Sequence, residues 1–324
     1  MAFAAVESRM KVLPKTGLVY EIMADRLRVG VYQDATLMGR AGAQMAASEM
    51  RRLEAIGIDP SMNFAAAPSQ RTFWASLVEE QGLPWDRTTA THMDDFMVSH
   101  DHILSFAGML RDELFSKLPS LKNIYYVNGS AADPASEADR YGSVLDANPR
   151  HIQVMGIGDN AHIAFAEPYI PGVTDPDERI YKANAWDRSA CKIVKIDDQC
   201  KAQQRAAYPG VEIPDFALSM TVPAILSAGE LICLVPYEQK AHAVLKTFTS
   251  LISEEVPATA LRTHDNAFML LDLESASLVI DIIKAVSPAY REPSEGMGGS
   301  DAWEIDNPSL LGNAELARMM FERQ

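Results

Sequence analysis

The chain has 324 residues, of which 48% are hydrophobic and 23% are charged, and this composition is typical of a globular protein rather than a disordered one. Its 44 acidic residues outnumber its 29 lysine and arginine residues, which gives a formal net charge of −15. Because nucleic acids and anionic membranes attract basic surfaces, and the sequence has no long cluster of lysine and arginine, it predicts neither a nucleic-acid partner nor a membrane partner.

The predicted elements alternate between short apolar runs and longer amphipathic stretches. Helices are expected at 34–56 (with Asp34 as the N-cap), 70–80, 101–115, 136–145, 238–252 and 274–285. Strands are expected at 62–67, up to about Met93, and at 123–127, 151–155, 230–235 and 268–272. Because strands alternate with helices, the pattern predicts an α/β fold with a mainly parallel sheet and helices on both faces.

Two segments break this alternation. Residues 167–187 are rich in proline, aspartate and tyrosine without periodicity, which predicts a long loop of the kind that often covers a ligand. The tail after Ser287 crosses a glycine- and serine-rich stretch and ends in an expected short helix at 313–322. We therefore expect one α/β domain over 1–287 and a C-terminal extension over 288–324. We expect this extension either to cap the domain or to pack against a second subunit, and in the second case the protein would be a homo-oligomer.

The cysteines and the apolar runs indicate the compartment. Cys191, Cys200 and Cys233 are too few and too irregularly spaced for a disulfide framework or a zinc site, and they favour a reducing compartment. The first residues lack the basic segment and apolar run of a signal peptide, and no stretch approaches the roughly 18 apolar residues of a membrane span. We therefore expect a cytoplasmic protein.

Ligands of open parallel sheets bind beyond the carboxyl ends of the strands, so the residues that follow each strand are the candidates for a site. After the first strand, segment 68–72 (PSQRT) combines hydroxyl groups, an arginine and a helix start, which suits a phosphate group; a plain helix cap is the alternative. After the second strand, the paired acids Asp94 and Asp95 suit proton abstraction, because partial burial raises the pKa of a carboxyl, or else they cap a turn.

Segment 156–168 (GIGDNAHIAFAEP) follows the strand at 151–155. Its glycines permit a tight turn, but it lacks the third glycine of a dinucleotide-binding motif, and the sequence contains no Walker A motif. His162 stands five residues before Glu167. A carboxylate beside an imidazole fixes its tautomer and tunes its pKa, so this pair predicts acid–base chemistry.

The same segment resembles the signature of glucosamine-6-phosphate deaminases, G-x-G-x-D/N-G-H-I-x-F-N-E-P. Other segments agree in order: 93–96 (MDDF) with M-D-E-Y, 123–129 with a strand before an N/D-G turn, 217–220 (ALSM) with A-L-T, and 239–241 (QKA) with x-K-A. The resemblance extends over roughly residues 30–285. It implies the modified Rossmann-like fold that this family shares with 6-phosphogluconolactonases and ribose-5-phosphate isomerases.

The resemblance implies a reaction as well: aldose–ketose isomerisation of glucosamine 6-phosphate, or a close analogue, with loss of ammonia and with no metal or organic cofactor. Asp94 would be the base that moves a proton between C2 and C1 of the open-chain sugar. His162 would assist ring opening, held by Glu167 and hydrogen-bonded by Asn160. The substrate's phosphate would contact Ser69, Gln70, Arg71, Thr72, Arg205 and Lys240.

The sequence departs from the family pattern at several of these positions. The phosphate loop lacks the usual glycines, which restricts the approach of the backbone, although Arg71 offers a bidentate contact instead. Asn160 stands where many members have aspartate, Ala161 where glycine is usual, and Ala166 where asparagine is usual. These changes bear on the identity of the substrate more than on the fold. Another amino sugar phosphate, such as a galactosamine derivative, is an alternative substrate.

Two other functions compete with the deaminase. A 6-phosphogluconolactonase-type hydrolase has a different acidic motif and no acid five residues beyond the histidine, so segment 93–96 and Glu167 speak against it. A non-catalytic sugar-phosphate-binding sensor is the alternative of another class. The presence of Asp94, His162 and Glu167 together with Lys240 favours an enzyme over a sensor.

Overall fold

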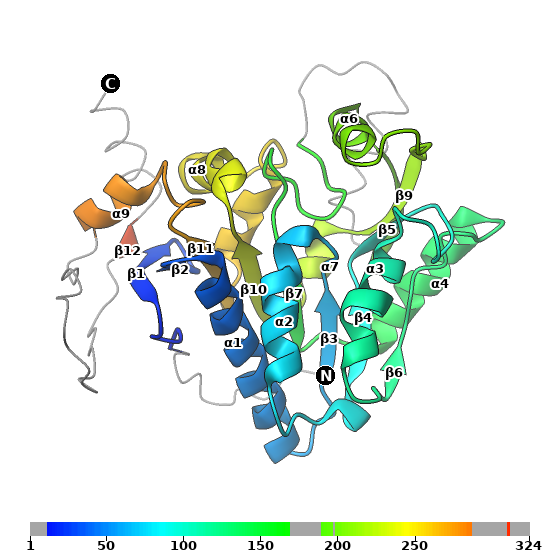
Figure 1. Cartoon of the computed structure of the whole chain (residues 1–324), viewed down its shortest axis with the longest axis horizontal. Helices are drawn as coiled ribbons and strands as arrows, with labels where there is room; N and C mark the ends of the chain where they lie inside the picture. The colour runs from blue at the N-terminus through cyan, green and yellow to red at the C-terminus, as the bar shows by residue number, and fades with distance from the viewer. Residues whose placement is uncertain (1–11, 169–188, 197, 287–309, 312–324) are drawn as a thin grey trace.

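The structure, a computed structural model, describes residues 12–168, 189–196, 198–286 and 310–311. Its main sheet has nine strands in the order β12-β1-β2-β11-β10-β7-β3-β4-β6 (Figure 1). The pair β1–β2 is antiparallel and all other neighbouring pairs are parallel. The strands are β1 (Leu18–Ala24), β2 (Leu27–Tyr32), β3 (Ser61–Phe64), β4 (Thr89–His92), β6 (Asn123–Ile124), β7 (Ile152–Met155), β10 (Glu230–Val235), β11 (Ala267–Asp272) and β12 (Leu310–Leu311).

Helices cover both faces of this sheet, as the alternating pattern predicts. One face packs against α1 (Ala35–Ala55), α2 (Arg71–Glu79) and α3 (Phe106–Glu113). Figure 1 shows α1 and α2 side by side across it. The other face packs against α4 (Pro134–Ala147), α7 (Val222–Leu226), α8 (Ala241–Thr249), α9 (Ile280–Val286) and the 3-10 helix η6 (Pro257–Thr263). Because both faces are covered, the central strands β10 and β11 are buried at every residue.

A second, smaller sheet stands beside the first. Its three strands, in the order β5 (Asp94–Phe96), β9 (Phe216–Met220) and β8 (Cys191–Lys195), are antiparallel, and α6 (Asp198–Ala207) follows β8. Only Met93 separates β4 from β5, so the small sheet begins at the carboxyl edge of the main one. Phe96, Val194 and Ala217 of this sheet form a separate small cluster with residues such as Cys200 of α6, whereas Leu218 and Met220 belong to the core of the main sheet.

Most of the expected elements are confirmed, with shifts at their ends. Asp34 caps α1 by accepting a hydrogen bond of 2.8 Å from the Leu37 N–H. The helix expected at 101–115 is shorter, because Ser105 caps it and α3 begins at the following residue. The strand expected at 123–127 ends at Ile124. Near the C-terminal end of the fold, the helix expected at 274–285 begins only at residue 280.

The hairpin of β1 and β2 was not expected from the sequence. Charged residues such as Glu21 and Arg28 interrupt its apolar pattern, and Asp25 makes the tight turn with a positive φ of 52°. Most of the expected loop at 167–187 and the expected helix at 313–322 lie outside the described residues. Within the described ranges, no helix has the length and apolarity needed to cross a membrane.

Candidate active site

The main sheet reverses its winding between β3 and β7. From β3 the chain passes through α2 to β4, which pairs with one side of β3. Strand β7 pairs with the other side of β3, and the chain later continues to β10 on the far side of β7. The loops that follow β3 and β7 therefore diverge, which leaves a crevice at the carboxyl edge of the sheet. A cavity of about 510 Å³ opens at this place. Its walls come from the loops after β3, β7 and β10, from β5, and from α3 and α6.

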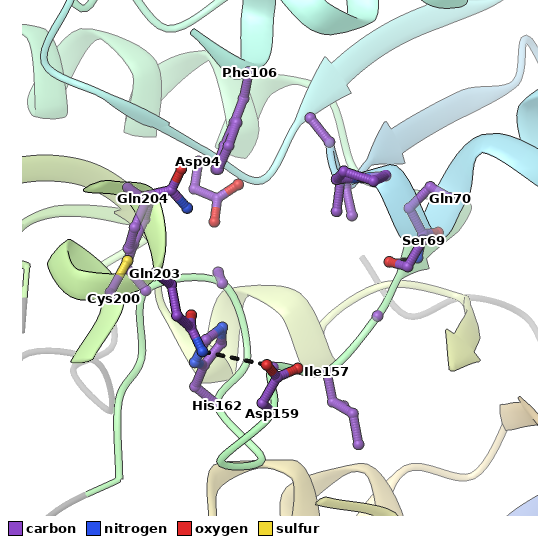
Figure 2. Close-up of a pocket in the computed structure, with 18 of the residues that line it drawn as sticks. Ser69, Gln70, Asp94, Phe106, Ile157, Asp159, His162, Cys200, Gln203 and Gln204 are labelled. Atoms are coloured by element: carbon purple, nitrogen blue, oxygen red, sulfur yellow. Dashed lines mark hydrogen bonds between the residues drawn. The ribbon is translucent and has the colours of Figure 1, made fainter. Parts of the chain in front are cut away.

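Asp94 supplies the acid of this cavity. Its side chain lies on β5, is 7% exposed and points into the cavity (Figure 2). Burial raises the pKa of Asp94 to about 7, the neighbouring Asp95 carboxyl adds to the rise, and His162 opposes it. A carboxyl with a pKa near 7 both takes up and gives back a proton at neutral pH, as a general base must.

Asp95, the next residue, has a structural task. Because successive side chains of a strand point to opposite faces, its carboxyl turns away from the cavity. It accepts hydrogen bonds from the backbone N–H groups of Phe106 (2.7 Å) and Ala107 (2.9 Å) and from the Ser105 hydroxyl (3.0 Å). Burial outweighs these donors and raises the pKa of Asp95 to about 6. Asp95 therefore ties β5 to the start of α3, and of the paired acids only Asp94 lines the cavity.

His92 fixes the backbone on which Asp94 stands, and the sequence analysis did not single it out. Its Nε2 accepts a hydrogen bond from the Val127 N–H (2.9 Å), so its Nδ1 carries the proton and donates it to the Asp94 carbonyl (2.9 Å). Complete burial lowers the pKa of His92 to about 4, so the ring is neutral. A histidine at the end of β4, two residues before an acid, is the signal that points to this role.

His162 enters the cavity from the loop after β7. Its Nδ1 lies 3.1 Å from Oε1 of Glu167, and the other oxygen of Glu167 accepts a hydrogen bond of 2.7 Å from the Asn160 amide. The side-chain carbonyl of Asn160 in turn accepts a hydrogen bond of 3.1 Å from the His162 backbone N–H. The ring lies against Gly158, where a Cβ would come within 2.1 Å of it, so only glycine fits there. The predicted group of His162, Glu167 and Asn160 is thus assembled around one turn.

Ala161, inside this turn, adopts a backbone conformation that glycine adopts more easily. Its φ is 73°, in the left-handed region, and the residue is fully buried. Its N–H donates to the Gly158 carbonyl (3.0 Å), and its carbonyl accepts from the Ala258 N–H (3.0 Å). These contacts hold the alanine in the conformation that the histidine turn requires, at a cost in backbone strain.

The opposite wall is built from two helix starts. The 3-10 helices η1 (Pro68–Gln70) and η5 (Glu238–Lys240) run directly into α2 and α8, and both line the cavity. The N-terminal ends of helices carry partial positive charge and favour anions. Figure 2 shows Ser69 and Gln70 across the cavity from Gln203 and Gln204 of α6. The Gln70 amide donates to the Leu234 carbonyl (3.3 Å), so it supports the loop.

Lys240 also lines the cavity, but it is paired. Its Nζ lies 2.5 Å from Oδ1 of Asp159, and the other oxygen of Asp159 accepts a hydrogen bond of 3.2 Å from the Gln203 amide, which Figure 2 marks with a dashed line. Neither Asp159 nor Gln203 was singled out from the sequence. Because Asp159 is distant in sequence from both Lys240 and Gln203, no local pattern reveals these contacts.

Three of the predicted phosphate contacts do not line the cavity. Arg71 makes a bidentate ion pair with Glu113, with both distances at 2.7 Å, because the 3-10 turn at 68–70 carries the next residues away from the cavity. Thr72 packs against α1, where a Cβ on Gly39 would come within 2.5 Å of its hydroxyl. Arg205 is an exposed residue of α6, and its predecessor Gln204 lines the cavity instead. Ser69, Gln70 and Lys240 are the predicted contacts that the structure brings there.

The described residues hold no group of three or more histidine, cysteine, aspartate or glutamate side chains arranged for a metal ion. The cavity combines a buried acid of near-neutral pKa with a histidine–carboxylate pair. These features, at the winding reversal of a mainly parallel sheet, define a Rossmann-like enzyme of acid–base chemistry.

Comparison with known proteins identifies the family. Residues 68–180 match the family model of glucosamine-6-phosphate isomerases and 6-phosphogluconolactonases. A glucosamine-6-phosphate deaminase of Bacillus cereus is 30% identical over 227 residues, which cover 69% of this chain and 80% of the relative. One of Listeria innocua is 30% identical over 220 residues, which cover 68% and 87%. The chain belongs to this family.

Solved structures agree with this assignment. A monomeric glucosamine-6-phosphate deaminase is 26% identical and superimposes with a TM-score of 0.67 over 77% of this chain and 99% of its own. A 6-phosphogluconolactonase of Shewanella baltica is 14% identical and has a TM-score of 0.62 over 79% and 99% of the two chains, a likeness of fold alone. The fold class expected from the sequence, a modified Rossmann-like α/β fold, is confirmed.

Proposed function

We propose that this protein is an amino-sugar-phosphate deaminase that converts glucosamine 6-phosphate, or a close analogue, into fructose 6-phosphate and ammonia. The observation that carries the proposal is the Asp94 carboxyl, with its pKa near 7, in the same cavity as the His162–Glu167 pair. The similarity to curated deaminases over two thirds of the chain supports the same activity.

His162 would act first, at the ring oxygen of the cyclic sugar. Its position beside Glu167 favours a ring that takes and returns a proton, because the carboxylate stabilises the charged imidazolium. Transfer of the proton from the anomeric hydroxyl to the ring oxygen opens the ring to the aldehyde. Asn160 forms hydrogen bonds with both the Glu167 carboxylate and the His162 backbone, so it holds the imidazole and the carboxylate next to each other.

Asp94 would then carry out the isomerisation. Its carboxylate removes the proton from C2 of the open-chain sugar while the aldehyde oxygen gains a proton from water, which gives an enolamine. The resulting carboxylic acid then returns its proton to C1, and the nitrogen releases one to water. The product is an imine at C2; water adds to it and ammonia leaves, which gives the ketose. A base that is half protonated near neutral pH suits both transfers, and burial supplies this property.

The phosphate group would lie at the opposite wall. The hydroxyl of Ser69, the starts of the helices at η1 and η5, and the ammonium group of Lys240 line that wall and are the groups that bind phosphate in proteins. The residues predicted from the sequence but turned away, Arg71 and Arg205, are left out of this proposal. Gln204 stands in the cavity where an arginine was expected.

The compartment and assembly remain parts of the proposal. Cys191, Cys200 and Cys233 are buried and form no disulfide with one another, which supports a cytoplasmic location. The division of the chain at residue 287 and a homo-oligomeric state stay predictions from the sequence.

The test is a measurement of ammonia release from glucosamine 6-phosphate by the purified protein, beside galactosamine 6-phosphate, with lactone hydrolysis measured on 6-phosphogluconolactone. Release from either amino sugar, with formation of the ketose phosphate, is the expected result and identifies the substrate. Hydrolysis of the lactone alone would assign the chain to the other branch of the family. Binding of the sugar phosphates with no turnover of any of them would instead indicate a sensor.

A further inference from the structure

The cavity has little positive charge for a site that receives a phosphate dianion. Among the described residues that line it, Lys240 and His162 are the only basic side chains. Two acids, Asp94 and Asp159, line it as well. Arg71, which stands one residue beyond the lining, is engaged with Glu113. The binding of a phosphate group therefore depends on the state of Lys240.

The Asp159 carboxylate already holds that lysine. Its Oδ1 lies 2.5 Å from the Lys240 Nζ, and the lysine side chain is 15% exposed against 39% for the aspartate side chain. Gln203 donates to the other carboxylate oxygen at 3.2 Å, so Asp159 joins the loop after β7 to the end of η5, where α8 begins, and to α6. A pair of this kind has no net charge, and its carboxylate repels an incoming anion.

We infer that Asp159 is a specificity-determining residue: its carboxylate occupies Lys240 as an internal counter-ion, and the phosphate of the substrate must compete with it. This inference rests on the proposed function, since it concerns the affinity of the same cavity for sugar phosphates. Asp159 weakens the binding of a dianion more than that of an uncharged sugar. It thereby sets how strongly the enzyme prefers phosphorylated substrates.

The test is the substitution Asp159→Asn, which removes the charge and keeps an oxygen for the Gln203 amide. The dissociation constants of inorganic phosphate, fructose 6-phosphate and fructose are measured by calorimetry on the whole chain. We expect the variant to bind phosphate and fructose 6-phosphate on the order of tenfold more tightly, which equals about 1.4 kcal/mol. The affinity for fructose should not change, and the KM for glucosamine 6-phosphate should fall with it.

A matched control removes a similar ion pair far from the cavity. Asp59 pairs with Lys122 and Arg87 at the amino end of β3, opposite the carboxyl edge. Asp59→Asn changes the net charge by the same amount, so it corrects for long-range effects of charge, and it should leave all three affinities unaltered. Thermal unfolding of each variant verifies that it folds, and Asp159→Ser is the second variant if the amide disturbs the loop.

The outcomes separate this inference from the proposed function. Equal or weaker binding of phosphate by Asp159→Asn would overturn the inference, because the carboxylate would then merely orient Lys240. Tighter binding of phosphate without ammonia release by either protein would refute the proposed function and leave the inference standing. Ammonia release by both the wild type and Asp159→Asn, with unchanged affinities for phosphate, would support the proposed function and refute the inference.

Discussion

The two walls of the cavity differ in how their side chains are held. On the acid–base wall, Asp94 and His162 are each fixed by hydrogen bonds of their neighbours, through the buried His92 for the first and through Asn160 and Glu167 for the second. On the anion wall, Lys240 is held by a single partly exposed carboxylate, that of Asp159. Both walls depart from the family pattern, the first at Asn160, Ala161 and Ala166 and the second in its phosphate loop without glycines.

The difference follows from what each wall must do. Proton transfer needs a donor and an acceptor within hydrogen-bond reach and with matched pKa values, so few arrangements serve. A phosphate is bound by any sufficient set of N–H groups, hydroxyls and cations, and these substitute for one another. We therefore expect substitutions on the acid–base wall to lower kcat, and substitutions on the anion wall to change KM.

The largest effect is expected for Asp94→Asn. The amide cannot take the C2 proton, so kcat should fall by about 10² to 10⁴, the usual contribution of a general base, while the affinity for fructose 6-phosphate stays close to that of the wild type. Steady-state kinetics and calorimetry measure the two quantities. Asp139→Asn, on the exposed side of α4, serves as the control. Turnover that survives Asp94→Asn would remove this residue from the mechanism.

The pKa of Asp94 adds a prediction about pH. Because the base must be ionised, kcat/KM should rise as the pH increases through about 7, and the pH-rate profile of the wild type checks this. A carboxyl whose pKa is raised from about 3.9 in the unfolded chain binds its proton more tightly in the fold. Its contribution to stability is therefore complete below pH 4 and is lost as the pH rises to about 7. Asp94→Asn should make the free energy of unfolding less dependent on pH in this window.

Glu167→Gln should weaken the acid–base wall without destroying it. The amide still contacts Asn160 but no longer stabilises a charged imidazole, so kcat should fall by a smaller factor, on the order of tenfold to a hundredfold. The measurement is kcat across a range of pH, since loss of the carboxylate should also shift the limb that reports His162. Glu113→Gln is the control, and because it releases Arg71, an unchanged KM also verifies that this arginine takes no part.

Lys240→Gln tests the anion wall in the same way. The loss of a charged hydrogen bond should raise the KM for glucosamine 6-phosphate by about tenfold and leave kcat almost unaltered. Unphosphorylated glucosamine, as a competitive inhibitor, should bind equally to both proteins. A fall in kcat with an unchanged KM would contradict the division of the cavity into two walls.

The smallest effect is expected for Ala161→Gly, which relieves the strained turn of the acid–base wall. The left-handed conformation costs alanine about 1 to 2 kcal/mol, and the greater freedom of glycine in the unfolded chain offsets about half of this. The free energy of unfolding should therefore rise by about 0.5 to 1 kcal/mol, which denaturant titration measures. Ala138→Gly, inside α4, should instead lower it by about 1 kcal/mol or more.

The residues brought together on the acid–base wall were accessible from the sequence because they follow strands. Asp94, Asn160 and His162 each stand a few residues beyond an apolar run, and the carboxyl ends of parallel strands meet at one edge. The side-chain directions of Arg71 and Arg205 could not be predicted in this way, because each of these residues lies on a helix. There a shift of one residue rotates a side chain by about 100°, which decides between the cavity and the solvent.

Local periodicity and short spacings in the sequence are enough to predict the α/β architecture, the places where strands end and the histidine–glutamate pair. The packing of distant segments places Gln204 rather than Arg205 in the cavity, and it brings Asp159 to Lys240, 81 residues away in the chain. It also decided the pKa of Asp94, since the exclusion of water from a carboxyl results from the packing of the whole fold around it.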